Sequence, residues 1–151
     1  MLTSNLLLPA SAFMPVVGQF PYLGDIIARD SGDALAVTSR IRAASQAFGA
    51  LRGCLFSSTF VTSAAKRAVY ESLVLSVLLY GSECWSLTEE LLQRLRVFHA
   101  QCLRGMCRVT RKHTWEHHIS TQELGQRLGL SLNSIDYYVA RRQLCWLGHV
   151  S

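Results

Sequence analysis

Proline is scarce in this chain, and all three residues (Pro9, Pro15 and Pro21) fall within the first 33 of 151 positions. Because proline inside a helix removes a hydrogen bond and clashes with the preceding turn, its absence after residue 33 favours helices. Charged residues make up only 17% of the sequence, against about 25% in a typical globular domain. A hydrophobic content of 50% excludes intrinsic disorder. We therefore expect a folded chain that buries part of its surface against a partner or a second copy.

Paired cysteines and long apolar runs are also missing. The five cysteines are odd in number and form no CxxC pair, which argues against a disulfide framework and for a reducing compartment. The longest apolar stretch, 69–80, is interrupted by Glu71 and is too short to span a bilayer. The apolar residues 2–13 lack the positively charged start of a signal peptide. The sequence predicts an intracellular protein, nuclear or cytoplasmic, with no membrane partner.

Catalytic motifs are not evident either. A polymerase or nuclease needs carboxylates that converge on metal ions, and the one acidic cluster is Asp25, Asp30 and Asp33. The last two flank a glycine turn, where aspartate is expected for backbone reasons. Neither GxGxxG nor GxxxxGK[ST] occurs, so no phosphate-binding loop of those types is present. We predict no cofactor and no catalysis by this chain alone.

One segment loosely imitates a zinc module, Cys102-x4-Cys107-x5-His113-x3-His117. A zinc finger needs about twelve residues between its two ligand pairs. In addition, Cys102 falls on an apolar helix face, where a buried thiol is the simpler explanation. We predict no metal site.

The apolar spacing after residue 33 predicts about five helices, at 37–51, 63–81, 88–106, 121–129 and 131–148. Ser63, Thr88 and Thr121 are the expected N-caps of the second, third and fourth. Before them, short apolar runs at 16–17 and 20–27 predict strands. The expected fold is mainly α, with a small N-terminal β-hairpin (1–33), a helical bundle (34–112) and a helix-turn-helix-like pair (113–151).

The third predicted helix carries a basic stripe. Between Arg94 and Lys112 there are six basic residues and no acid. At 100° per residue, a sector of about 100° contains five polar side chains, namely Arg94, Gln101, Arg104, Arg108 and Arg111. A helix packed by one face and lined with arginine on the next can lie along a phosphate backbone. The alternative is an ordinary solvated face.

The last two helices have the layout of a helix-turn-helix reader of DNA. In that interpretation Asn133, Ser134, Tyr137 and Arg141 would face the bases. Any two packed helices joined by Gly-Leu-Ser would look the same in a single sequence. The large aromatic residues Tyr80, Trp85 and Trp146 each adjoin an apolar run and are expected to anchor the core.

Several short motifs occur together in one order. Phe20-Pro-Tyr-Leu-Gly24 is similar to an F-x-YLG hairpin, and the helix from Arg40 ends in Ala47-Phe48-x-x-Leu51. Lys66-x3-Tyr70 leads to Leu78-Leu-Tyr-Gly-Ser-Glu83 and Trp85. Phe98-x3-Cys102-Leu-Arg104 follows, and Arg141-Arg-Gln-Leu-x-Trp146-x-Gly148-His149-Val150 closes the series. Over roughly residues 14–151, this pattern resembles the reverse transcriptases of non-LTR (LINE-like) retrotransposons.

The resemblance implies the C-terminal part of such an enzyme: the end of the palm, the thumb and the helical region that follows. The metal-binding aspartates of that family lie in an F/Y-A-D-D motif before F-x-YLG, and no such motif occurs here. We therefore expect a truncated, non-catalytic fragment that holds an RNA–DNA hybrid, or other nucleic acid, without sequence preference. The alternatives are a helix-turn-helix regulator and a structural pseudo-domain that binds nothing.

By position, the resemblance assigns two sets of contacts. The primer-grip-like turn consists of Phe20, Tyr22, Leu23 and Gly24. The nucleic-acid-binding set consists of Arg40, Arg42, Lys66, Arg67, Arg94, Arg104, Arg108 and Arg111. Two departures stand out, since Pro21 replaces the usual basic residue of the hairpin and His118 stands where the family often has asparagine. An apolar face made to meet the missing palm would lead the isolated chain to self-associate.

Overall fold

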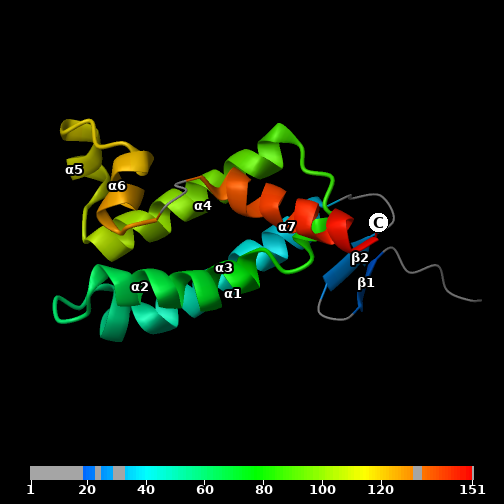
Figure 1. The fold of residues 1–151 in the computed structure, drawn as a ribbon, viewed down its shortest axis with the longest axis horizontal. Helices are drawn as coiled ribbons and strands as arrows, with labels where there is room; N and C mark the ends of the chain where they lie inside the picture. The colour runs from blue at the N-terminus through cyan, green and yellow to red at the C-terminus, as the bar shows by residue number, and fades with distance from the viewer. Residues whose placement is uncertain (1–18, 23–24, 29–32, 131–133, 151) are drawn as a thin grey trace, which may run out of the picture.

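The computed structural model describes residues 19–22, 25–28, 33–130 and 134–150, and it confirms a mainly helical chain. The principal elements are β1 (Gln19–Tyr22), β2 (Asp25–Ala28), α1 (Ala34–Leu51), α2 (Ser63–Val69), α3 (Leu75–Leu78), α4 (Glu89–Cys107), α5 (Arg111–Glu116), α6 (Thr121–Arg127) and α7 (Ile135–Val150). Two π-helical segments, η1 (Arg52–Phe56) and η2 (Tyr70–Val74), extend α1 and join α2 to α3, and η3 (Ser82–Cys84) is a 3₁₀ turn. Figure 1 shows α1 to α3 on one side of the core and α4 to α7 on the other.

The two short strands pair antiparallel, with Phe20 opposite Ile27 and Tyr22 opposite Asp25. β2 leads into α1 and contacts it, so the strand pair lies at the end of the bundle where α1 begins (Figure 1). Leu23 and Gly24 of the predicted primer-grip-like turn lie outside the described residues.

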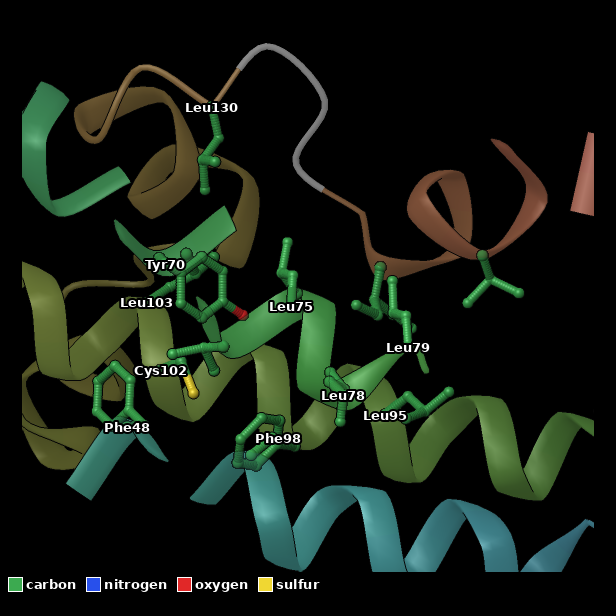
Figure 2. Close-up of a cluster of buried hydrophobic side chains, with 14 of the residues drawn as sticks. Phe48, Tyr70, Leu75, Leu78, Leu79, Leu95, Phe98, Cys102, Leu103 and Leu130 are labelled. Carbon is green, nitrogen blue, oxygen red and sulfur yellow. The ribbon is translucent and has the colours of Figure 1, made fainter. Parts of the chain in front are cut away.

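The apolar face predicted for α4 is confirmed. Its five residues are all buried: Leu91, Leu95, Phe98, Cys102 and Met106. Figure 2 shows several of them packed with Tyr70, Leu75, Leu78 and Leu79 from the opposing run of helices. Because α1 and the α2–α3 run both pack around it, α4 is the central element of the core.

The helix at 63–81 departs from its predicted phase. An unbroken α-helix would bury Lys66, Tyr70, Leu73 and Val77, but Leu73 is 50% exposed, and the buried positions continue as Val74 and Leu78. The wider turns of η2 explain the difference, because they advance the buried face by four residues at each step instead of alternating three and four. The helix ends near Gly81, whose φ of 79° is readily accessible only to glycine.

The N-cap predictions were correct for α4 and wrong by one residue elsewhere. The hydroxyl of Thr88 accepts from the Leu91 amide at the start of α4. The caps of α2 and α6 are Thr62 and Ser120, each one position before the predicted residue. In both cases two neighbouring residues carry hydroxyls, so composition alone did not separate the cap from the first helical position.

Only one of the three aromatic residues expected to anchor the core is buried. Trp85 is buried, as predicted, whereas Tyr80 and Trp146 are both 47% exposed, so for these two the prediction was wrong. Tyr80 lies beneath Arg40, whose guanidinium carbon is 4.4 Å from the ring centroid. Because this cation–π contact involves a charged group, it favours a solvent-exposed position for Tyr80 and not a position in the core.

In the part of the chain that the structure describes, no helix is both long and apolar enough to cross a membrane. α6 packs mainly against α4, whereas α7 packs against η3 and α4. The final two helices are thus each fastened to the central helix, an arrangement that does not favour a self-contained helix-turn-helix pair.

Candidate nucleic-acid interface

A cavity of about 650 Å³ lies between α1 with η1 and the second half of α4 with the start of α5. Four arginines line it, and we call them the cavity arginines: Arg52, Arg104, Arg108 and Arg111. No carboxylate occurs among its lining residues in the described part of the chain. It is thus a concave, positively charged surface.

The end of α4 brings three of these arginines together. Arg104 lies in the last turn of α4, and Arg108 follows the helix with a φ of 58°, in the left-handed region. The Val109 amide then donates to the Arg104 carbonyl at 3.0 Å, which closes the turn. The predicted stripe assumed one helix through Arg111. Instead, α4 ends at Cys107, and Arg111 reaches the same cavity from the first position of α5.

Arg52 comes from the opposite wall and was missed by the sequence analysis. It follows Ile41, Ser45 and Phe48 at steps of four, three and four, which places all of them on one helical face. That face lies against α4, since Phe48 is buried and Ser45 and Arg52 line the cavity. A basic residue that continues an apolar stripe was the signal that could have identified it.

The floor of the cavity is apolar and tightly packed. Phe48, Phe98 and Cys102 belong to its lining, and both phenylalanines are more than 90% buried. Figure 2 shows the three side chains near one another in the core. Gly105 permits the close approach of α1 and α4, because a Cβ at that position would lie 3.0 Å from the Phe48 ring. Burial raises the pKa of Cys102 to about 12, so this thiol stays neutral and does not offset the positive charge.

Arg104 has a lowered pKa and nevertheless keeps its charge. Burial and the neighbouring Arg111 guanidinium lower the pKa of Arg104 from its usual value. Arginine nevertheless remains protonated in proteins. Within the described residues, none of the four cavity arginines makes an ion pair with a carboxylate, although the chain has acids available. Their guanidinium donors are therefore available to an external anion.

Another set of basic residues is used internally. We call them the bridging cations: Lys66, Arg67, Arg96 and Arg142. The buried Lys66 ammonium lies 3.5 Å from the Met106 carbonyl at the end of α4, and Arg67 donates to the Gly129 carbonyl after α6. Arg96 binds Asp136 at 3.0 Å and also Glu89. Each of these side chains joins segments that are distant in the sequence.

The structure therefore divides the predicted nucleic-acid set. It places Arg104, Arg108 and Arg111 around one cavity. Arg94 lines a second hollow on the neighbouring surface of α4, and Gln101 lines both this hollow and the cavity. By contrast, Lys66 and Arg67 bind protein carbonyls, Arg40 covers Tyr80, and Arg42 is exposed on α1 away from the cavity lining. Phe20 and Tyr22 lie in β1, remote in sequence from all of these.

The cysteines and histidines of the zinc-like segment are not arranged as ligands in the structure. Cys102 is in the core, and the Cys107 thiol lies 3.6 Å from the Leu124 carbonyl. His113 and His117 pack ring to ring on α5, with centroids 4.2 Å apart. No group of three or more His, Cys, Asp or Glu side chains suited to a metal ion occurs among the described residues.

Two of the motifs that carried the family resemblance bind each other. Arg142 donates to the Leu79 carbonyl at 3.0 Å and lies 3.6 Å from the Glu83 carboxylate. Gln143 donates to the carbonyls of Ser82 at 3.3 Å and Trp85 at 3.1 Å. The LLYGSE-x-W turn and the R-R-x-L helix thus form one hydrogen-bonded junction, which is a structural reason for them to occur together.

Comparison with known proteins supports a transposon origin. The chain is similar to an uncharacterized transposon-derived protein of Caenorhabditis elegans, with 28% identity over 135 residues, 89% of this chain and 47% of that protein. The chain therefore spans about half the length of this relative. No protein-family profile matches the chain, and no solved structure matches it.

Proposed function

We propose that this chain is a non-catalytic fragment of a retrotransposon reverse transcriptase that holds template–primer nucleic acid through contacts with the phosphate backbone. The observation that carries the proposal is the set of cavity arginines, which converge on one cavity without internal carboxylate partners among the described residues. The similarity to a transposon-derived protein supports the origin. The reverse transcriptase assignment rests on the motifs of the sequence.

The chemistry of these side chains suits phosphate. A guanidinium presents a planar fork of donors that pairs with two phosphate oxygens at once. Arg94 and Gln101 extend the polar surface along α4 from the cavity. Contacts of this kind release counterions and read no bases, so the binding is salt-dependent and tolerant of sequence.

The strand pair has a separate place in the proposal. By the resemblance, the turn of Phe20, Tyr22, Leu23 and Gly24 would position a primer 3′ end at the bundle end where α1 begins. Self-association through an apolar face also stays a prediction, and α7 presents exposed Leu144 and Trp146 for it. Neither of these is needed for the cavity to hold a phosphate backbone.

Fluorescence anisotropy of a labelled RNA–DNA hybrid and a matched DNA duplex tests the proposal. We expect binding of both, with some preference for the hybrid and none for sequence. The variant Arg104→Ala/Arg108→Gly should lose about tenfold or more in affinity, because each lost charged hydrogen bond contributes about 1.5–3 kcal/mol. The control Arg127→Ala/Arg141→Ala removes the same charge from exposed positions outside the cavity lining.

Two results would contradict the proposal. Absence of binding at low salt by a folded sample would leave a structural pseudo-domain that binds nothing as the remaining interpretation. A preference for one DNA sequence that disappears with Arg141→Ala would favour the helix-turn-helix regulator instead.

A further inference from the structure

The shape of the cavity, together with its positive charge, indicates which class of anion it can bind. We propose that the cavity is a binding site for a compact polyphosphate, such as the terminal phosphates of a nucleotide or of the 5′ end of a strand. This inference deepens the proposed nucleic-acid function and rests on it. Its basis is that the cavity arginines stand on two facing walls, with Arg52 opposite the other three.

Concavity favours a chain end over the middle of a duplex. A duplex presents its phosphates singly along a convex backbone, about 3.4 Å apart along the axis on each strand. A recess walled by α1 with η1 on one side and α4 with α5 on the other admits a protruding group more readily than a rigid ridge. Its volume of about 650 Å³ lies within the range of small-molecule sites, about 300–1,000 Å³.

The number of converging cations favours several phosphates close together. Arg104 and Arg111 line the same cavity, and after burial the Arg111 guanidinium is the second cause of the lowered pKa of Arg104, so the two side chains repel each other. A ligand with three or more negative charges in a small volume would neutralise both walls at once. A lone phosphate would leave part of this repulsion in place.

The backbone conformation of Arg108 also supports a ligand site. This residue has a φ of 58° at a helix end where glycine is the usual residue, and the left-handed conformation disfavours a side chain. The geometry nevertheless places an arginine of the cavity lining there. Strained residues of this kind gather at ligand sites, where binding offsets the strain.

The remaining lining fits the same ligand. Ser45 and Ser57 supply hydroxyl donors on the Arg52 wall, and Phe48 and Phe98 close the floor without an acidic group. Carboxylates would repel a polyphosphate, and the described lining has none. Every charged group that faces the cavity therefore has the sign that the ligand needs.

The first test is thermal unfolding with sodium tripolyphosphate, compared with sodium sulfate at matched ionic strength. We expect a saturable rise in Tm with tripolyphosphate that sulfate does not reproduce, because a ligand that binds only the folded state raises its stability. The variant Arg104→Ala/Arg108→Gly should weaken tripolyphosphate binding by about tenfold or more, and Arg127→Ala/Arg141→Ala by less than about twofold. Circular dichroism confirms that each variant is folded, and the single variant Arg108→Gly serves if the double one is not.

A second measurement separates the two sources of the ligand. One RNA oligonucleotide is titrated with a 5′-triphosphate and with a 5′-hydroxyl, and ATP is titrated as a competitor. Tighter binding of the triphosphorylated strand than of ATP assigns the site to strand ends, whereas equal competition by ATP assigns it to free nucleotides. Either result supports the polyphosphate site.

The inference is overturned if tripolyphosphate and sulfate shift Tm equally, or if the cavity variant binds tripolyphosphate as well as the unchanged chain does. Its failure is distinguishable from that of the proposed function. Hybrid binding that depends on the cavity arginines, in a chain that does not bind tripolyphosphate, would remove the polyphosphate site and leave nucleic-acid holding in place. Tripolyphosphate binding without hybrid binding would retain the site and remove the proposed function.

Discussion

The bridging cations and the cavity arginines are all basic side chains of the helical bundle, and they differ in what surrounds them. The bridging cations bind carbonyls or carboxylates of distant segments. The cavity arginines line a hollow whose described lining includes no carboxylate. The comparison teaches that position relative to helix ends and acidic side chains, and not net charge, decides which basic residues can serve a ligand. Changes in the first group should alter stability, and changes in the second should alter binding.

The largest loss of stability is expected from Lys66→Ala. Lys66 is only 6% exposed, so its stem packs in the core while its ammonium faces the Met106 carbonyl. Removing both contacts should lower the free energy of unfolding by about 2–3 kcal/mol in urea denaturation. The matched variant Lys66→Met keeps the apolar stem and should lose about 1 kcal/mol. An unchanged midpoint together with weaker hybrid binding would instead place Lys66 among the ligand contacts.

A smaller loss is expected from Arg142→Ala, which breaks the junction between α7 and the turn after α3. The guanidinium contacts the Leu79 carbonyl and the Glu83 carboxylate, both of which would lose this partner. The expected decrease in unfolding free energy is about 1–2 kcal/mol. The neighbouring Arg141 is exposed, and Arg141→Ala should stay within about 0.5 kcal/mol of the unchanged chain. Equal effects of the two substitutions would contradict the division into two groups.

Arg108→Gly should separate binding from stability. Glycine relieves the left-handed strain at this helix end, although it also gives the unfolded chain more freedom. The net change in unfolding free energy should lie between zero and a gain of about 1 kcal/mol. Affinity for the hybrid should fall in the same sample, because a cavity charge is gone. A marked loss of stability would show that Arg108 has a structural partner and belongs with the bridging cations.

The smallest effect concerns acid stability at the Arg96–Asp136 pair. Burial alone would raise the pKa of Asp136. Hydrogen bonds from Arg96 and Ser134 together lower it by more than burial raises it, so the pKa lies below its usual value. A carboxylate with a depressed folded-state pKa contributes stability above its unfolded pKa of about 3.9, and loses it as the pH falls through the folded value.

The check is the urea midpoint between pH 7 and pH 3. The unchanged chain should lose more stability over this interval than Arg96→Gln, in which the carboxylate has lost its main partner. Parallel pH profiles would show that the pair contributes nothing to folding, as is common for partly exposed ion pairs.

How far the sequence predicted this fold depended on how regular each segment is. α4 was predicted correctly because Thr88, two acids in the first turn and an unbroken apolar stripe all agree. The second half of the 63–81 helix was not, because a π-helical insertion has no residue signature in this segment and it changes which side chains face inward. Leu73, which an unbroken α-helix would bury, is therefore exposed.

The site was predicted in part for a similar reason. The stripe through Arg104 and Arg108 follows from local periodicity, which a sequence contains. Arg111 was also predicted, although from one continuous helix, whereas it reaches the cavity from the first position of α5. Arg52 was missed because it reaches the cavity through the packing of α1 on α4, which periodicity does not report. Lys66 was assigned to nucleic acid by the resemblance, and its actual acceptor, the Met106 carbonyl, lies 40 residues away, where no local pattern indicates it.

The central claim is that the cavity arginines are the chain's contact with phosphate. The most direct test is the slope of log Kobs against log salt for the RNA–DNA hybrid, since each phosphate contact contributes about 0.9 to that slope on B-form duplexes. Arg104→Ala/Arg108→Gly should flatten the slope by nearly two contacts, and Arg127→Ala/Arg141→Ala should leave it close to that of the unchanged chain. An equal change in both variants would show that the chain binds through its overall charge, and the account of the cavity would be wrong.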